Sequence, residues 1–190
     1  KYIDLHLHLD GAITAETAME LAKVQGISLP AKTEKKLAKL ISVPEGCTSL
    51  NDFLRCFELP LSLLQTREGI RRAVRLVLEE QKREGVIYAE IRFSPQLHTR
   101  KGLSQEEVLR SALEGLQDAP IPANLILACM RGADNEALNM QTVETAKKYL
   151  GPVVCAVDIA GAEGLFPTEN FAPVFAKVRE YGIPMTIHAG

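Results

Sequence analysis

A helix, a glycine and an apolar strand follow one another three times along this chain, and this repeat constrains the fold more than any other feature. Glycine just past the end of a helix adopts the left-handed backbone conformation at little cost, so it marks where a helix stops. The three copies comprise 67–84, Gly85 and 86–93; 134–150, Gly151 and 153–160; and 168–181, Gly182 and 183–188. We therefore predict an α/β protein built from successive β-α units.

The predicted strands carry continuous apolar runs rather than an alternating pattern. Parallel strands covered by helices on both faces have such sequences, so we predict a parallel sheet. With 2–9 and 124–130 added, the chain provides five strands in one domain, 1–190. A doubly wound sheet and a (βα)8 TIM barrel both fit this order, although five strands are too few to close the barrel. Because the chain lacks an initiator Met and stops as a strand finishes, we interpret it as incomplete.

The connection between the first two strands is much longer than the usual link of about 2–6 residues in such units. It is predicted to hold three helices, at about 14–25, 32–41 and 49–64. The third helix carries an apolar stripe, which fits either a helix packed on the sheet or a lid over a ligand. The stripe comprises Leu50, Phe53, Leu54, Phe57, Leu61 and Leu64.

Composition excludes several classes of protein. The formal net charge of −2 gives no broad basic field, so long nucleic acids and acidic membranes are not expected as partners. No apolar run approaches the length of a membrane-spanning helix. Four scattered cysteines form neither a disulfide framework nor a Cys-based zinc site. Reduced, mostly buried thiols fit a cytoplasmic protein.

His6 and His8 are the first candidates for metal ligands. They lie two apart on a predicted strand, so both imidazoles are expected on one face. Two neutral imidazoles in one small space suit a divalent transition metal. The alternative is a hydrogen-bonded pair at a strand edge. Asp10-Gly11 follows, and it fits either a turn with a helix cap or a carboxylate that binds a substrate hydroxyl.

His188 is the third candidate ligand. It ends the last predicted strand, and the carboxyl ends of parallel strands meet at one rim of a sheet. Three histidines with an open fourth position are typical of a catalytic zinc site. We assign no role to His98.

Further polar residues lie on the predicted strands. Asp158 within an apolar run must be paired if it is buried. Gly161 after the same strand fits either a turn or a place where a ligand approaches the backbone. Glu90 and Arg92 share one strand face, and we interpret them first as a structural ion pair.

In order along the chain, five segments resemble the adenosine deaminase family, the zinc barrels of the amidohydrolase type. The segments are 6–12, 53–57, 88–95, 158–161 and 188–190. The resemblance implies a (βα)8 TIM barrel of the metal-dependent hydrolase type, of which this chain covers about the first five strands. It also implies that 14–66 is a helical lid inserted after the first strand.

The resemblance also implies roles for individual residues. His6, His8 and His188 would bind one zinc ion. Asp10 would hold a ribose hydroxyl, and the backbone of Gly161 would meet the purine ring. The lid side chains over the nucleoside would be Phe53 and Phe57. The acid, the base and the fourth ligand of the family lie beyond residue 190, so no catalytic residue is assigned within the chain.

The activity implied by the resemblance is hydrolytic deamination of adenosine and 2′-deoxyadenosine to inosine and 2′-deoxyinosine, with release of ammonia, in purine salvage. Relatives that act on the free base tend to carry Glu at the position of Asp10, which favours a nucleoside. Two alternatives stay open: a deaminase of adenine or of a modified nucleoside, and a non-catalytic module that binds a nucleoside or a metal. The 190 residues alone are expected to be inactive.

Overall fold

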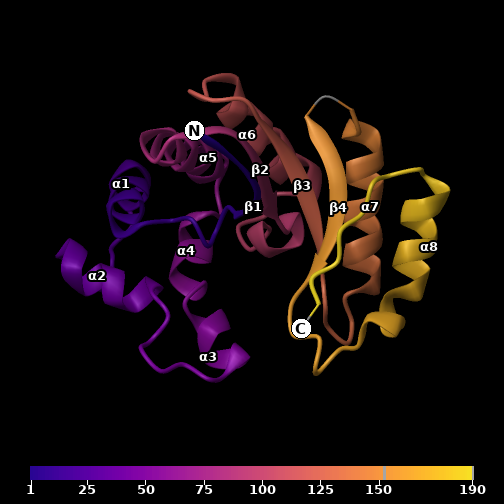
Figure 1. Cartoon of the computed structure of the whole chain (residues 1–190). Helices are drawn as coiled ribbons and strands as arrows, with labels where there is room; N and C mark the ends of the chain where they lie inside the picture. The colour runs from indigo at the N-terminus through magenta and orange to yellow at the C-terminus, as the bar shows by residue number, and fades with distance from the viewer. Residues whose placement is uncertain (152, 190) are drawn as a thin grey trace.

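A computed structural model describes residues 1–151 and 153–189, and this part of the chain forms a four-stranded parallel sheet. Its strands are β1 (Tyr2–His8), β2 (Val86–Phe93), β3 (Ala123–Met130) and β4 (Val154–Ala160). Each strand pairs with the next in chain order (Figure 1). A doubly wound sheet would reverse this order at a switch point, so the topology is that of a barrel. Pro152 and Gly190, which belong to a predicted turn and to the last predicted motif, lie outside the described residues.

Helices join the strands and cover the sheet. In Figure 1, α7 and α8 lie beside β4, whereas α1 to α4 form a separate group next to β1. Contacts place α5 on β2 and on α6, and α7 on β3 and β4. The helices are α1 (Ala15–Gln25), α2 (Glu34–Ile41), α3 (Leu50–Arg55), α4 (Glu58–Leu63), α5 (Arg67–Arg83), α6 (Gln105–Gln117), α7 (Glu136–Tyr149) and α8 (Ala172–Glu180), with short 3-10 turns η1 (Pro95–His98) and η2 (Thr168–Phe171).

Local sequence explains where these helices begin and end. Thr66 caps α5 through its hydroxyl, and Ser104 with Glu107 forms a capping box at α6. Gly85 and Gly182 have φ angles of 94° and 65°, so the predicted glycine stops are confirmed at both positions.

The third lid helix was predicted as one unit over 49–64, and this is wrong. The structure breaks it into α3 and α4 around Cys56 and Phe57. Pro60 explains the break, because it has no N–H to donate to the carbonyl of Cys56 in a continuous helix. The predicted apolar stripe is therefore divided between two short helices.

The fifth predicted strand, 183–188, is not a regular strand. The segment does run parallel to β4, since the Val157 N–H donates to the Pro184 carbonyl and the Thr186 N–H donates to the Val157 carbonyl, both at 2.9 Å. Only one bridge forms between the two, from Val157 to Met185. Pro184 offers no donor to the ladder, which limits the pairing.

The core is aliphatic and lies between the sheet and its helices. Large side chains with no exposed surface include Leu21, Leu63, Ile70, Ile91 and Leu125. Burial of such side chains stabilises the fold by roughly 1.5–3 kcal/mol each.

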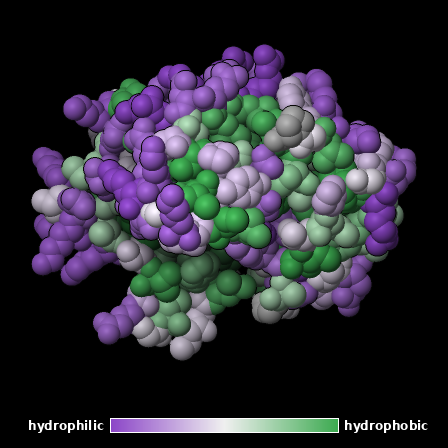
Figure 2. All heavy atoms as spheres, turned by 45° about the horizontal axis from the view of Figure 1, so that its top comes forward, coloured by the Kyte–Doolittle hydropathy of each residue, from purple (hydrophilic) through white to green (hydrophobic). Residues whose placement is uncertain are grey.

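Part of β1 faces solvent. Ile3 and Leu5 are 56% and 54% exposed, and Figure 2 shows hydrophobic residues reaching the surface between hydrophilic ones. Within the described residues β1 pairs with β2 only, so its other edge is open. No helix in the described part of the chain is long and apolar enough to span a membrane. The prediction of mostly buried thiols is wrong: all four cysteines are free, but only Cys129 is buried.

Candidate metal centre

An irregularity in β1 shapes the site. The register against β2 shifts between Asp4 and Leu7, so the strand holds one extra residue there. The backbone N–H of His6 donates to the Asp4 carboxylate at 2.9 Å. Simple alternation therefore does not describe this stretch, although His6 and His8 still present their rings to one another.

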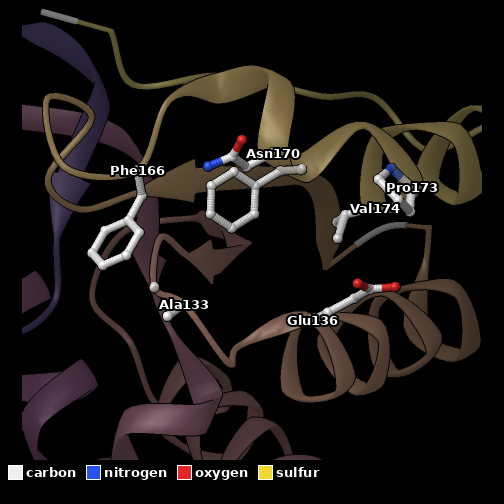
Figure 3. Close-up of a pocket in the computed structure, with 8 residues that line it drawn as sticks. Ala133, Glu136, Phe166, Asn170, Pro173 and Val174 are labelled. Atoms are coloured by element: carbon white, nitrogen blue, oxygen red, sulfur yellow. The ribbon is translucent and has the colours of Figure 1, made fainter.

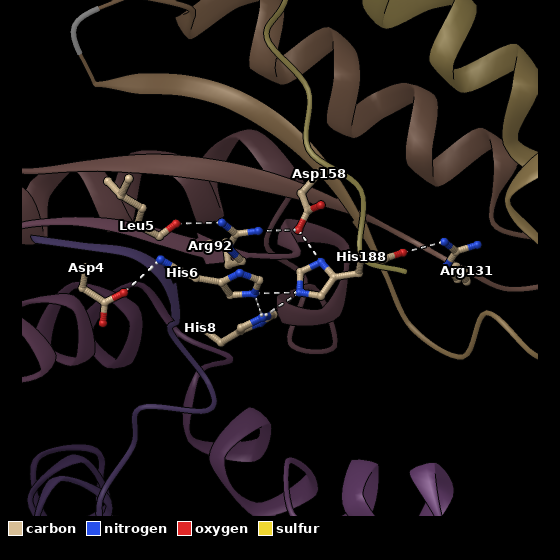
Figure 4. Close-up of polar contacts among 8 residues, drawn as sticks. All are labelled: Asp4, Leu5, His6, His8, Arg92, Arg131, Asp158 and His188. Carbon is tan, nitrogen blue, oxygen red and sulfur yellow. Dashed lines mark hydrogen bonds and ion pairs between the residues drawn. The ribbon is translucent and has the colours of Figure 1, made fainter. Parts of the chain in front are cut away.

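Three histidines converge at the carboxyl ends of the strands, as the sequence predicts. The Nε2 atoms of His6 and His188 lie 2.9 Å apart, those of His8 and His188 3.1 Å, and those of His6 and His8 3.3 Å (Figure 4). Nitrogens that share one tetrahedral zinc ion at about 2.0–2.1 Å lie about 3.3 Å apart. The three atoms are thus arranged as ligands of one ion.

The protonation of the cluster also fits a metal. Burial lowers the pKa of His8 to about 4, with help from the neighbouring His188 and His6. Burial and the positive charge of Arg92 lower the pKa of His6 as well. Neutral imidazoles are the form that binds a metal. Three converging nitrogen lone pairs can share one cation, and the residues present fit zinc.

A buried ion pair stands behind the third histidine. Asp158 Oδ2 lies 2.7 Å from His188 Nδ1 and 3.0 Å from Arg92 Nη1. A proton on Nδ1 directed at this carboxylate leaves Nε2 as the free lone pair. Burial alone would raise the pKa of Asp158, but contacts with His188, Thr186 and Arg92 outweigh it and lower that pKa.

Arg92 also forms a hydrogen bond to the irregular part of β1. Its Nη2 donates to the Leu5 carbonyl at 2.8 Å, beside the register shift in β1. The predicted ion pair between Glu90 and Arg92 is wrong, because Arg92 turns to Asp158 across the sheet. Glu90 instead accepts a hydrogen bond from the Tyr88 hydroxyl at 3.3 Å. The partner of Arg92 lies two strands away, where a pattern within one strand cannot indicate it.

Phe57, in the helical insertion after β1, lies near the segment that carries His6 and His8. A Cβ added to Gly11 would lie 3.3 Å from the His8 Cβ and 3.3 Å from the Phe57 ring, so the ring packs against Gly11, three residues after His8. Phe53 contacts Phe57 edge to face at 5.3 Å between centroids. Asp10 lies in the turn after β1, where burial raises its pKa and Gly11 N–H donates to its carboxylate at 3.1 Å.

Gly161 packs against a residue that the sequence argument missed. Its φ is 113°, and an added Cβ would lie 3.2 Å from the Cβ of Arg131. Arg131 follows β3 and donates to the carbonyl of His188 at 2.8 Å. An arginine directly after an apolar strand, at the ligand-binding end of a parallel sheet, is the signal that could have identified it.

His98 is structural, consistent with the absence of any assigned role. It is buried, and its Nδ1 lies 3.0 Å from the Leu64 carbonyl, which ties the lid to the turn after β2. A cavity of about 300 Å³ opens elsewhere, between the start of α7 and the η2–α8 region (Figure 3). None of the histidines lines it. The residues lining it are Gly132, Ala133, Glu136, Phe166, Asn170, Phe171, Pro173 and Val174.

Comparison with known sequences agrees with this geometry. The sequence model of the family described as adenosine deaminase matches residues 2–190. A curated adenosine deaminase from Haemophilus ducreyi is 49% identical over 196 residues, which cover 99% of this chain and 57% of that protein. A curated adenosine deaminase from Clostridium perfringens is 40% identical over 192 residues, which cover 99% of this chain and 58% of that protein.

Solved structures share the fold. An adenine deaminase from Arthrobacter aurescens superposes with a TM-score of 0.84 at 26% identity, over 99% of this chain and 57% of that one. An N6-methyl-AMP deaminase from Arabidopsis thaliana superposes with a TM-score of 0.79 at 25% identity, over 99% of this chain and 57% of that one. The chain therefore spans a little over half the length of the relatives it matches, and its sheet is the first part of a TIM barrel. By sequence and by fold, it belongs to the adenosine deaminase family.

Proposed function

We propose that this chain provides the metal ligands and the nucleoside-facing lid of a zinc-dependent deaminase. The proposed reaction converts adenosine and 2′-deoxyadenosine to inosine and 2′-deoxyinosine, with release of ammonia. The observation that carries the proposal is the convergence of the Nε2 atoms of His6, His8 and His188 within 2.9–3.3 Å of one another. They meet at the end of a parallel sheet where barrel enzymes bind substrates.

The three histidines would hold zinc, with Asp158 fixing the orientation of His188. Zinc bound there would supply the Lewis acidity that turns water into a nucleophile at neutral pH. Arg92 neutralises part of the charge of Asp158 and keeps that carboxylate in place. The proton transfers of the reaction need groups from outside these 190 residues, so we propose that the chain alone is inactive.

Substrate recognition is proposed for residues on either side of the histidines. Asp10, in the turn after β1, would accept a hydrogen bond from a ribose hydroxyl. Gly161 has no side chain, and the position that a Cβ would take points at Arg131, so its backbone would be open to the purine ring. The paired rings of Phe53 and Phe57 would cover the nucleoside and exclude water.

A second candidate substrate is the free base adenine. The solved relative from Arthrobacter aurescens is an adenine deaminase, and it covers 99% of this chain. We favour the nucleoside because Asp10 supplies a hydroxyl acceptor where relatives that act on the base tend to carry Glu. Substitution Asp10→Ala should then weaken binding of adenosine much more than binding of adenine.

Metal content is the first test. The purified chain, dialysed against zinc and analysed by plasma mass spectrometry, should retain one zinc per molecule. The variant His188→Ala should retain far less, while His98→Asn should match the wild type. Equal zinc in the wild type and in His188→Ala would refute the site.

Turnover is the second test. The longest natural protein that contains this chain should convert adenosine to inosine, as followed by the change in ultraviolet absorbance. Adenine and N6-methyl-AMP serve as competing substrates. A higher kcat/KM on either of them than on adenosine would overturn the proposed substrate.

A further inference from the structure

Arg131, directly after β3, contacts both the loop between β4 and α8 and a proposed metal ligand. Its side chain has no exposed surface. A buried guanidinium is costly unless its donors find acceptors. The hydrogen-bond acceptors of Arg131 therefore indicate which segments its side chain holds in place.

One set of acceptors lies in the loop between β4 and α8. Arg131 Nη1 donates to the Phe166 carbonyl at 2.9 Å, and Nη2 donates to the Thr168 hydroxyl at 2.9 Å. Glu163 completes this side as an ion pair at 3.4 Å, and the Thr168 hydroxyl donates to Glu163 at 2.6 Å. The loop thus wraps around the guanidinium.

The other acceptor is the main chain of the third histidine. Arg131 Nη2 donates to the His188 carbonyl at 2.8 Å (Figure 4). The His188 N–H donates to the Ile159 carbonyl at 3.0 Å. Asp158 holds the ring of the same histidine. The backbone of His188 is therefore fixed on both sides of its Cα, and Arg131 provides one of the two attachments.

The main chain of Arg131 is equally constrained. Its N–H donates to the Ala160 carbonyl at 2.8 Å, and Gly161 packs against its Cβ. A side chain at position 161 would push Arg131 away. The same residue thus contacts the proposed purine-facing glycine, the loop beyond it and the proposed zinc ligand.

We propose that Arg131 is a positioning residue that couples the β4–α8 loop to the metal site through the carbonyl of His188. The inference rests on the proposed function, because it requires His188 to bind a metal. Loss of a residue that orients a ligand weakens metal binding by about 10–100-fold. A purely structural arginine would change the stability of the fold and leave the metal affinity of the folded protein unchanged.

The test compares two isosteric threonine variants. Thr168→Val removes a partner of Arg131 that does not touch any of the three histidines. Thr142→Val removes a buried hydroxyl that bonds to Gln105 at 2.6 Å, in the packing between α6 and α7. Both variants should lower the melting temperature, but only Thr168→Val should weaken cobalt or zinc binding. Arg131→Gln should weaken it more, by about tenfold.

Cobalt titrations with the visible absorption spectrum as readout measure affinity and ligand geometry together, well below the melting temperature of each variant. Unchanged cobalt affinity and spectrum in both Thr168→Val and Arg131→Gln would overturn the coupling. A comparable loss in Thr142→Val would overturn it too, since destabilisation alone would then explain the effect. If the wild-type chain binds neither cobalt nor zinc, the proposed function is refuted. That result differs from the two outcomes above, in which the wild-type chain binds metal and only the role of Arg131 is refuted.

Discussion

Asp158 touches His188 and Arg92 with the same carboxylate oxygen, at 2.7 Å from the imidazole Nδ1 and 3.0 Å from the guanidinium Nη1. The aspartate and the arginine are almost fully buried. A proton held between Nδ1 and the carboxylate fixes both the tautomer and the direction of the histidine ring. The orientation of the third proposed ligand therefore depends on a residue that does not face the metal.

Replacing Asp158 by Asn should raise the dissociation constant for zinc by about 10–100-fold. The amide keeps the size of the side chain but loses the charge that favours a proton on Nδ1. Competition with a zinc-binding dye measures the effect. Glu80→Gln, in an exposed pair with Arg83 on α5, is the matched loss of one acidic charge and should leave the affinity unchanged. Equal affinities in all three proteins would contradict this role for Asp158.

Replacing Phe57 by Ala should weaken adenosine binding about tenfold, because about 1–2 kcal/mol of apolar burial over the nucleoside is lost. Zinc binding should stay the same, since the ring packs against Gly11 and has no polar atom with which to hold a ligand nitrogen. Calorimetric titration of adenosine into the zinc-loaded protein checks the first expectation, and titration of zinc into the metal-free protein checks the second. Leu40→Ala, at an exposed position on α2, is the control. A parallel loss of zinc in Phe57→Ala would mean that the ring supports the histidines rather than the ligand.

His98 should make the stability of the fold depend on pH. Burial lowers the pKa of His98 from 6.5 to about 4. Between these values the unfolded chain takes up a proton that the folded chain does not, so the free energy of unfolding falls as the pH falls from about 6.5 to about 4. The loss is on the order of 3 kcal/mol.

The variant His98→Asn removes this titration and keeps an N–H near the position of Nδ1 for the Leu64 carbonyl. Urea unfolding at pH 7 and at pH 4.5 should therefore show a smaller loss for the variant. His6 and His8 titrate in both proteins, so their effect cancels in the comparison. If both proteins lose the same stability, His98 is not the responsible group.

Replacing Gly115 by Ala should destabilise the fold by about 1–3 kcal/mol. The added methyl would lie 2.5 Å from the Arg71 carbonyl oxygen and 2.9 Å from the Val74 Cβ, which forces α6 away from α5. Gly164→Ala meets nothing within 4 Å and should be neutral. Chemical denaturation compares the two, and equal midpoints would show that the helices can separate without cost.

The sequence predicts the elements that depend on local signals. Glycine stops and hydroxyl caps lie within one turn of the residues that they affect, so the ends of α5 and α6 follow from their own neighbourhoods. The convergence of His6, His8 and His188 also follows, because parallel strands bring their carboxyl ends to one rim. Their assignment to zinc came from this placement together with the family resemblance.

Features that depend on distant partners were not predictable. Nothing near Arg92 in the sequence indicates that it pairs with Asp158, 66 positions later, rather than with Glu90 two positions before. Arg131 was missed for the same reason, since its acceptors lie 32–57 positions further along the chain. The break at Pro60 is different: its cause is local, and the apolar stripe outweighed the proline in the prediction.

His6 and His188 are 182 positions apart in the chain, and their nitrogens lie 2.9 Å apart. Bringing such distant positions together costs an unfolded polypeptide conformational entropy, so we expect this contact to form late in folding. An ion bound by these histidines would act as a reversible cross-link that closes nearly the whole chain into one loop, much as a disulfide does. Uptake of the ion would thus mark the end of folding, and a chelator would release the first strand from the last segment.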